Sequence, residues 1–350
     1  MSDRAQEGAT AKRDVLLEVR GLETHFISRE GTLRAVDGVS FDVKRGRVLG
    51  IVGESGCGKS VTSQSILRIV PRNGVIAGGS MVLHRDSGPV DLATLDPKGP
   101  EIRAIRGKEI AMVFQEPMTS FSPVYSVGNQ IMEVIRLHQK LSKADAATEA
   151  VAMLRRVGMP NPETLLHSYP FELSGGMRQR AMIAMALSCR PRLLIADEPT
   201  SALDVTVQAQ ILELLQHLMR ELDMATMLIT HDLGVVAELS HDLLIMYLGR
   251  SVEYGSVRDV FHDPKHPYTV GLLNSIPKLG VSSAGTQLTP IQGSVPSLYE
   301  IPPGCPFHPR CPRFMPGVCD AGKPPVVTAA PGHEVACFLY GEAAAGRSDA

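Results

Sequence analysis

The stretch Gly53-Glu54-Ser55-Gly56-Cys57-Gly58-Lys59-Ser60 decides the fold, because it has the pattern of a phosphate-binding loop. The continuous apolar run 48–53 before it predicts a buried parallel strand, and a helix is expected to begin near Lys59. In that context the Lys59 ammonium reaches the β- and γ-phosphates, and the Ser60 hydroxyl is a ligand of Mg²⁺. The tight turn that points backbone N–H groups at the phosphates is predicted to need Gly53, Gly56 and Gly58.

Acidic residues and a histidine follow at the ends of two later apolar runs. The run 193–196 predicts a strand ending in Asp197, a carboxylate suited to Mg²⁺, and Glu198 could polarise the attacking water. His231 follows a strand that ends at Thr230. We expect His231 to contact the γ-phosphate and to hold Glu198 and the water in register. Cys57 occupies a variable loop position, where a small residue valued for its backbone is favoured over a redox role.

The bulk composition narrows the class of protein. The 350 residues are 44% hydrophobic and 21% charged, which is ordinary for a globular chain with an ample core. A net charge of -2 gives no electrostatic case for a nucleic-acid partner. There is neither a run of roughly 20 apolar residues nor the apolar core of a signal peptide. We therefore expect a cytosolic protein whose membrane role, if any, comes through a partner.

Alternating strands and helices predict an α/β core with a mainly parallel sheet. The stretch 121–188 is mostly helical in pattern and long enough to be a subdomain inserted into that core. After about Asp263, frequent prolines predict an irregular appendage, and a single phosphate loop indicates one ATPase unit. The expected strands are 16–19, 33–36, 39–43, 48–53, 110–114, 193–196 and 226–230, and the expected helices include 59–67, 146–157 and 207–222.

The sequence Leu173-Ser174-Gly175-Gly176 separates one class of ATPase from the others. With the motifs above, in this order, the chain resembles the nucleotide-binding subunit of an ATP-binding cassette (ABC) transporter. The resemblance implies a P-loop ATPase core with a mainly parallel sheet, an N-terminal antiparallel β subdomain, an inserted helical subdomain and an irregular, metal-binding C-terminal extension. The implied boundaries are a disordered lead-in 1–14, a nucleotide-binding domain 15–263 with the helical subdomain at about 121–188, an extension 264–340 and a disordered tail 341–350.

The resemblance also assigns roles to residues. Two such subunits face head to tail, so that each completes the ATP site of the other. Gln115 matches the glutamine that touches Mg²⁺ and links the site to membrane subunits, and Phe26 is the candidate aromatic that stacks on adenine. Residues predicted to bind the subunit's own ATP are Phe26, Gly53, Ser55, Gly56, Cys57, Gly58, Lys59, Ser60, Val61 and Asp197. Residues predicted to act on the partner's ATP are Ser174, Gly175, Gly176 and Asp204.

Longer stretches indicate a subfamily. Residues 173–180, 196–205 and 266–269 resemble the oligopeptide/dipeptide importer ATPases, and Met177 after Gly-Gly is typical of the first of their two paired subunits. This implies a heterodimer with a homologous second ATPase beneath two membrane permease subunits, served by an extracytoplasmic solute-binding protein. The chain would then lie on the cytoplasmic face of the inner membrane. Peptides are the first expected solute, with oligosaccharides, nickel chelates and opines as alternatives.

Four cysteines, Cys305, Cys311, Cys319 and Cys337, lie in the proline-rich tail at gaps of five, seven and seventeen residues. Four thiolates can close a Zn²⁺ site or hold an iron–sulfur cluster, and in a reducing cytosol both are favoured over disulfides. The gaps are wider than those of zinc knuckles. Members of the resembled subfamily carry a [4Fe-4S] cluster in such a tail, so we expect that cluster, with Zn²⁺ and four unliganded thiols as the alternatives.

Two other classes of function are weaker. A soluble ABC ATPase of the translation-factor type usually holds two cassettes, whereas this chain has one phosphate loop. The chromosome-organising type places long coiled coils between the phosphate loop and residues 173–176, which we call the signature sequence. Residues 60–174 of this chain lack sustained heptads. A nucleic-acid-binding metal finger needs a basic surface. The tail offers only Arg310, Arg313 and Lys323 among many prolines.

Overall fold

The computed structural model describes residues 14–116, 120–201, 203–275 and 291–341. The predicted disordered ends lie outside these ranges, apart from residues 14 and 341. The chain forms two compact units that interleave along the sequence. Among the described residues, the first unit takes those of 14–17, 43–48 and 83–229, and the second takes those of 18–42, 49–82 and 230–341.

Three buried parallel strands form the centre of the first unit. They are β6 (Ile110–Val113), β7 (Leu193–Asp197) and β8 (Ala225–Ile229), with β7 in the middle. All their residues are buried, which explains why the sequence shows continuous apolar runs rather than alternation. The three predicted strands are confirmed to within one residue at each end.

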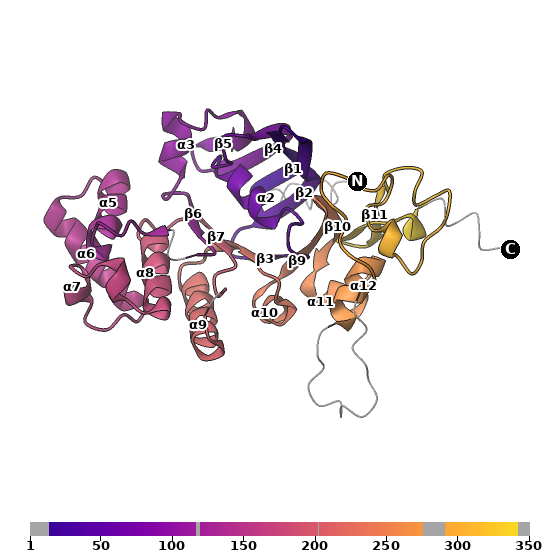
Figure 1. Cartoon of the computed structure of the whole chain (residues 1–350). Coiled ribbons are helices and arrows are strands. Elements are labelled where there is room, and N and C mark those ends of the chain that lie inside the picture. Colours follow the sequence, from indigo (N-terminus) through magenta and orange to yellow (C-terminus); the bar gives the residue numbers. More distant parts are fainter. Residues whose placement is uncertain (1–13, 117–119, 202, 276–290, 342–350) are drawn as a thin grey trace, which may run out of the picture. The chain divides into compact units, whose positions relative to one another are not determined.

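The first unit has six α-helices among its described residues. The serines Ser126, Ser142 and Ser174 cap three of them by accepting a backbone N–H bond. Within the predicted helical stretch 121–188, α5 (Val127–Gln139), α6 (Lys143–Arg156) and α8 (Gly175–Leu187) pack against one another (Figure 1). The helices are α3 (Pro100–Ile105), α5 (Val127–Gln139), α6 (Lys143–Arg156), α7 (Pro162–Leu165), α8 (Gly175–Leu187) and α9 (Val205–Glu221), with 3₁₀ turns at Leu92–Thr94 and Pro170–Glu172.

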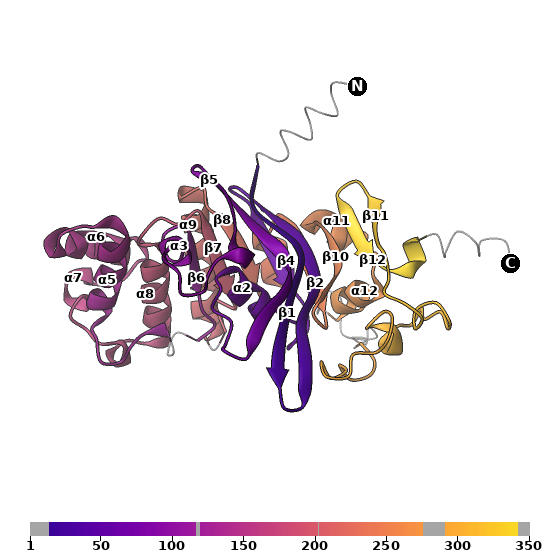
Figure 2. The same ribbon diagram turned by 90° about the horizontal axis from the view of Figure 1, so that it is seen from above.

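The sheet of the second unit is mostly antiparallel. β3 (Val48–Val52) pairs in parallel with β9 (Asp242–Tyr247), whereas β9 pairs antiparallel with β10 (Arg250–Ser256). Two strands of the C-terminal extension continue this sheet beyond β10, in the order β12 (His333–Ala336) and β11 (Val326–Ala330) (Figure 2). The mainly parallel sheet is therefore confirmed for the first unit only. The extension was expected to be irregular, and the strands β11 and β12 correct that expectation, since the edge of β10 is open to pairing with β12.

A further sheet contains β1 (Val15–Ser28), β2 (Gly31–Lys44), β4 (Gly74–Arg85) and β5 (Gly88–Asp91), in the order β2-β1-β4-β5. Two-residue connections join β1 to β2 and β4 to β5, so each of these adjacent pairs runs antiparallel. The sequence predicted shorter strands here. The segments 33–36 and 39–43 are parts of one strand, β2, and Gly38 between them has φ +88°, a conformation that glycine adopts without strain.

The second unit has four helices among its described residues. α2 (Lys59–Ile66) begins at the predicted residue. α12 forms where prolines were expected to prevent regular structure, because Pro267 sits in its first turn, where a missing N–H costs little. The other helices are α10 (Leu233–Leu239) and α11 (Val257–His262), α12 spans Pro267–Asn274, and 3₁₀ turns lie at His308–Arg310 and Phe338–Tyr340.

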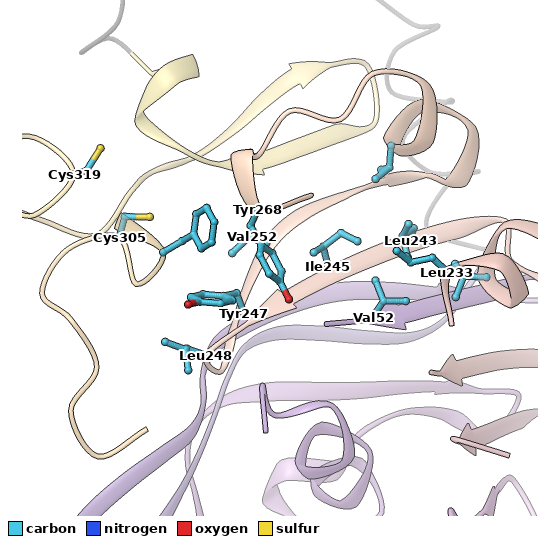
Figure 3. Close-up of a cluster of buried hydrophobic side chains, with 13 residues drawn as sticks. Val52, Leu233, Leu243, Ile245, Tyr247, Leu248, Val252, Tyr268, Cys305 and Cys319 are labelled. Carbon is cyan, nitrogen blue, oxygen red and sulfur yellow. The ribbon is translucent and has the colours of Figure 1, made fainter. Parts of the chain in front are cut away.

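One apolar cluster joins the extension to the rest of the second unit (Figure 3). Tyr247, Tyr268 and Phe307 contact each other with ring centroids 4.7 to 5.3 Å apart. Val52, the last residue of β3, belongs to the same cluster, as do Cys305 and Cys319. The strand that leads into the predicted phosphate loop and the cysteine-rich segment therefore share one core.

Candidate functional site

The predicted phosphate loop connects β3 to α2 in a closely packed backbone. A Cβ at Gly58 would lie 2.3 Å from the Ala35 carbonyl oxygen, and Gly58 has φ +99°, so a larger residue does not fit. The buried Lys59 ammonium donates to the Gly53 carbonyl at 2.7 Å and to the Glu54 carbonyl at 3.2 Å. The loop thus presents a fixed set of backbone groups around one lysine.

The remaining loop residues differ in exposure. Ser55 and Gly56 are exposed, and Ser60 and Val61 are half-buried. Cys57 is buried, and this burial raises the pKa of its thiol. A protonated, buried thiol supports the interpretation of Cys57 as a small packing residue.

Sequence reasoning missed the partners of Glu54 within the second unit. The Glu54 N–H donates to the Tyr268 hydroxyl at 3.0 Å, and its carboxylate pairs with Arg310 at 2.7 Å. Tyr268 belongs to the His-Pro-Tyr-Thr stretch that the sequence already singled out. Arg310 lies 256 residues from Glu54, and no local pattern pointed to it.

In the first unit, two predicted catalytic side chains meet. Asp197 ends β7 and is buried, and Glu198 follows in the left-handed region at φ +46°. The Glu198 N–H donates to the Ile229 carbonyl at 2.8 Å, which fixes the turn. The Gln115 side-chain amide donates to the Glu198 carboxylate at 3.0 Å. The Ser201 hydroxyl lies 3.0 Å from the carbonyls of both Gln115 and Glu198.

His231 and Phe26 both belong to the second unit. His231 is exposed, directly after Thr230, whose N–H donates to Ile51 of β3 at 3.3 Å. The residue before His231 is therefore hydrogen-bonded to β3, the strand that leads into the phosphate loop. Phe26 is half-buried on β1, and its ring is 3.0 Å from the position of a Cβ at Gly74.

The signature sequence forms the start of α8 in the first unit. Ser174 caps this helix by accepting the Met177 N–H at 3.3 Å, and Ser174 and Gly175 are exposed. A Cβ at Gly176 would lie 2.8 Å from Val207 of α9, so glycine allows the two helices to approach. Asp204, also exposed, caps α9 by accepting the Val207 N–H at 2.9 Å.

A buried glutamine ties the signature helix to the loop after Glu198. Gln179 is 1% exposed and its amide donates to the Pro199 carbonyl. Gln179 lies within residues 173–180, whose pattern indicates the subfamily but no role for this side chain. Its burial at the side of α8 that faces the Glu198 loop could only be found from the packing of the helix.

Comparison with known proteins agrees with these motifs. Residues 36–201 match the ABC transporter family. A probable peptide ABC transporter ATP-binding protein of Sinorhizobium fredii is 51% identical over 95% of this chain and 97% of its own length. The chain belongs to the ABC transporter family. Residues 252–319 of this ABC protein also match the C-terminal region of the oligopeptide/dipeptide transporter family.

Other relatives of this ABC protein are similar along almost their whole length. The dipeptide transport ATP-binding protein DppD of Bacillus subtilis is 48% identical over 94% of this chain and 96% of its own. Among solved structures, cbiO1 of Clostridium perfringens, part of the ABC transporter complex cbiONQ, superimposes with a TM-score of 0.59 and 28% identity. It covers 74% of this chain and 95% of its own. The likeness supports the P-loop ATPase fold with mixed sheets.

No helix in the described part of this ABC protein is both long and apolar enough to cross a membrane.

The four tail cysteines line one small cavity together with His266 and Phe307. Burial raises the pKa of the Cys305 thiol to about 11 and that of Cys337 to about 12. Across the described residues, however, no three histidine, cysteine or acidic side chains are grouped closely enough to hold a metal ion. The structure therefore does not support the prediction that the extension binds a metal ion.

A buried histidine lines the same cavity as the four thiols. His266 is buried, its Nδ1 accepts the Tyr268 N–H at 3.1 Å, and its Nε2 has no hydrogen-bond partner. Nδ1 as acceptor leaves the proton on Nε2, which is therefore a buried donor in a residue that lines the same cavity as four thiols. Desolvation lowers the pKa of His266 to about 3, so this donor is a neutral imidazole.

Proposed function

We propose that this chain hydrolyses ATP to drive import of peptides or similar small solutes across the bacterial cytoplasmic membrane. One observation carries the proposal. About half of the residues are identical, over 93 to 95% of the chain, to ATP-binding proteins named for peptide, dipeptide and oligopeptide transport. The match to the oligopeptide/dipeptide C-terminal region supports the same class of solute.

The residues of the nucleotide site divide the chemistry among them. Lys59 would neutralise the β- and γ-phosphates, while Ser60, Asp197 and Gln115 would hold Mg²⁺. Glu198 would polarise the attacking water. Its hydrogen bond from Gln115 keeps that carboxylate in one orientation. His231 would hold Glu198 and the water in register against the γ-phosphate.

A second subunit would complete the site. The exposed cap of α8 carries Ser174 and Gly175, which with Gly176 and Asp204 would contact ATP bound to the partner. We infer that the partner is a homologous but different ATPase. Two permease subunits and an extracytoplasmic solute-binding protein would complete the importer, with this chain on the cytoplasmic face of the membrane. ATP-driven closure of the heterodimer would turn the permease, and hydrolysis would reset it.

The domain boundaries remain those of the resemblance. The nucleotide-binding domain would span 15–263, with the helical subdomain at about 121–188 inside it, and the extension would span 264–340. The helices α5 to α8 within 121–188 and the strands β11 and β12 within 264–340 support this division.

We propose that the extension binds a [4Fe-4S] cluster through Cys305, Cys311, Cys319 and Cys337 in preference to Zn²⁺. Four thiols around one cavity suit a cluster, which spreads its ligands more widely than a single ion does. When bound, the cluster would cross-link a segment that has little core of its own. Phe307 and His266 would exclude water from it, and His266 Nε2 would supply a hydrogen bond to sulfur.

Uptake by cells tests the import function. In cells that depend on this chain, replacing it with the Glu198→Gln variant is expected to abolish accumulation of a labelled dipeptide or oligopeptide. Glu213→Gln, which changes an exposed glutamate on α9, is the matched control and should leave uptake unchanged. Undiminished peptide uptake by the Glu198→Gln cells would contradict the proposal.

A further inference from the structure

The phosphate loop is held from its side by the C-terminal extension. The Arg310 guanidinium donates two parallel hydrogen bonds to the Glu54 carboxylate, from Nη1 at 2.7 Å and from Nη2 at 3.1 Å. Only 5% of the Arg310 side chain and 25% of the Glu54 side chain are exposed. A bidentate, mostly buried ion pair is the strong form of this interaction, unlike an exposed pair on the surface.

Glu54 is bonded through its backbone as well. Its N–H donates to the Tyr268 hydroxyl at 3.0 Å, and its carbonyl accepts from the Lys59 ammonium at 3.2 Å. The carboxylate, the N–H and the carbonyl of one loop residue are therefore all occupied. Two of its four hydrogen-bond partners, Tyr268 and Arg310, come from beyond residue 263, whereas Lys59 and Cys57 belong to the loop itself. The extension therefore holds the loop at Glu54.

Arg310 is itself held rigidly. Its Nε donates to the Gln292 carbonyl at 3.1 Å, and its guanidinium lies 5.9 Å from the ring centroids of both Tyr247 and Phe307. The hydrogen bond to Glu54 raises the pKa of Arg310, which keeps it charged. Arg310 also stands one residue before Cys311 and five after Cys305, so the cysteine-rich segment sets its position.

The charge of Glu54 explains why this contact matters for nucleotide binding. Glu54 lies inside the loop that receives a triphosphate, and an unpaired carboxylate there would repel it. Removing one partner of a largely buried pair leaves the other charge uncompensated. Arg310 cancels the Glu54 charge without itself being part of the loop.

We propose that Arg310 is a positioning residue for the phosphate loop, through which the cysteine-rich extension sets the affinity of this ATPase for ATP. The extension is then a functional part of the nucleotide site. Arg310 acts through Glu54 and contacts neither the phosphates nor Mg²⁺. A change in the path of residues 305–311 would reach Glu54 of the loop through this ion pair.

A double-mutant cycle on the purified full-length chain tests the proposal. The measurement is the Kd for a non-hydrolysable MgATP analogue, for Arg310→Met, Glu54→Gln and the double variant. Arg310→Met is expected to raise Kd about tenfold or more, because it exposes the phosphates to an unpaired carboxylate. Glu54→Gln removes that carboxylate, so the double variant should bind within about threefold of wild type.

Two further variants separate positioning from mere stabilisation. Arg310→Lys keeps the charge and should recover part of the affinity that Arg310→Met loses. Arg313→Met removes an exposed positive charge from the same segment and should leave Kd unchanged. Melting temperatures of all variants show whether each is folded. If Arg310→Met does not fold, Arg310→Lys still tests the proposal.

The outcomes are distinguishable from failure of the ATPase function itself. If the wild type does not bind the analogue, the nucleotide site is wrong. If the wild type binds and a folded Arg310→Met variant has the same Kd, Arg310 has no positioning role. A double variant as weak as Arg310→Met would also overturn the proposal, since the loss would then be unrelated to the Glu54 charge.

Discussion

The phosphate loop and the cysteine-rich extension differ in how their parts come together. The groups of the loop that are predicted to bind phosphate, its backbone N–H groups and Lys59, all lie within the contiguous residues 53–60. The four tail cysteines span 33 positions, and a β-strand pair, β11 and β12, lies between the last two of them. A contiguous motif carries its own geometry, whereas a dispersed ligand set depends on the path of the chain between its members.

Glu198→Gln should give the largest effect on the contiguous side of this comparison. Turnover of ATP is expected to fall by a factor of about 10² to 10⁴, because a glutamine cannot polarise water, while ATP binding persists. Steady-state phosphate release and equilibrium nucleotide binding measure the two properties separately. Glu213→Gln is the control, and normal turnover in Glu198→Gln would remove Glu198 from its role.

Gly58→Ala should weaken ATP binding through geometry alone. The added methyl would lie 2.3 Å from the Ala35 carbonyl oxygen, so the loop must shift, and a shift of that kind is expected to weaken ATP binding about a hundredfold. Gly88→Ala is matched to it, since Gly88 also has positive φ, at +109°, but open space around its Cβ position. ATP binding as strong in Gly58→Ala as in Gly88→Ala would show that the loop does not depend on close packing.

Cys305→Ser tests whether the four dispersed tail cysteines bind a metal cluster. Anaerobically purified wild type is expected to contain about four irons per chain with a broad absorption band near 400 nm, and the variant should lose both. Cys189→Ser, which changes a cysteine outside the tail, should keep them. One zinc per chain in the wild type would support the alternative that the four thiols bind Zn²⁺. Absence of both metals would support four unliganded thiols.

Local sequence patterns specify some parts of this molecule and leave others unspecified. The strands that flank the loop and the carboxylates were predicted closely, because continuous apolar runs and glycine spacing act locally. The pairing of β12 with β10 and the ion pair between Glu54 and Arg310 were not, because each joins segments at least 80 residues apart. The helix α12 was missed for a different reason: Pro267 reads as a breaker unless it is recognised as a first-turn residue.

Asp204→Ala should give the smallest effect, and it separates two roles of one residue. Loss of the N-cap of α9 is expected to lower the free energy of unfolding by about 1 kcal/mol, whereas Asp204→Asn keeps the cap. Thermal or denaturant unfolding of the two variants measures this difference. Equal stability of both would mean that the cap contributes nothing, and a defect in ATP turnover shared by both would point to the interface role.

The most direct test of the account is ATP hydrolysis by the assembled importer in lipid vesicles. The chain should co-purify with two permease subunits and a second ATPase. Peptide-loaded binding protein should then raise the rate of ATP hydrolysis, and Glu198→Gln in this chain should suppress that stimulation. A chain that purifies free of membrane subunits, and whose hydrolysis is indifferent to the binding protein and peptide, would contradict the account.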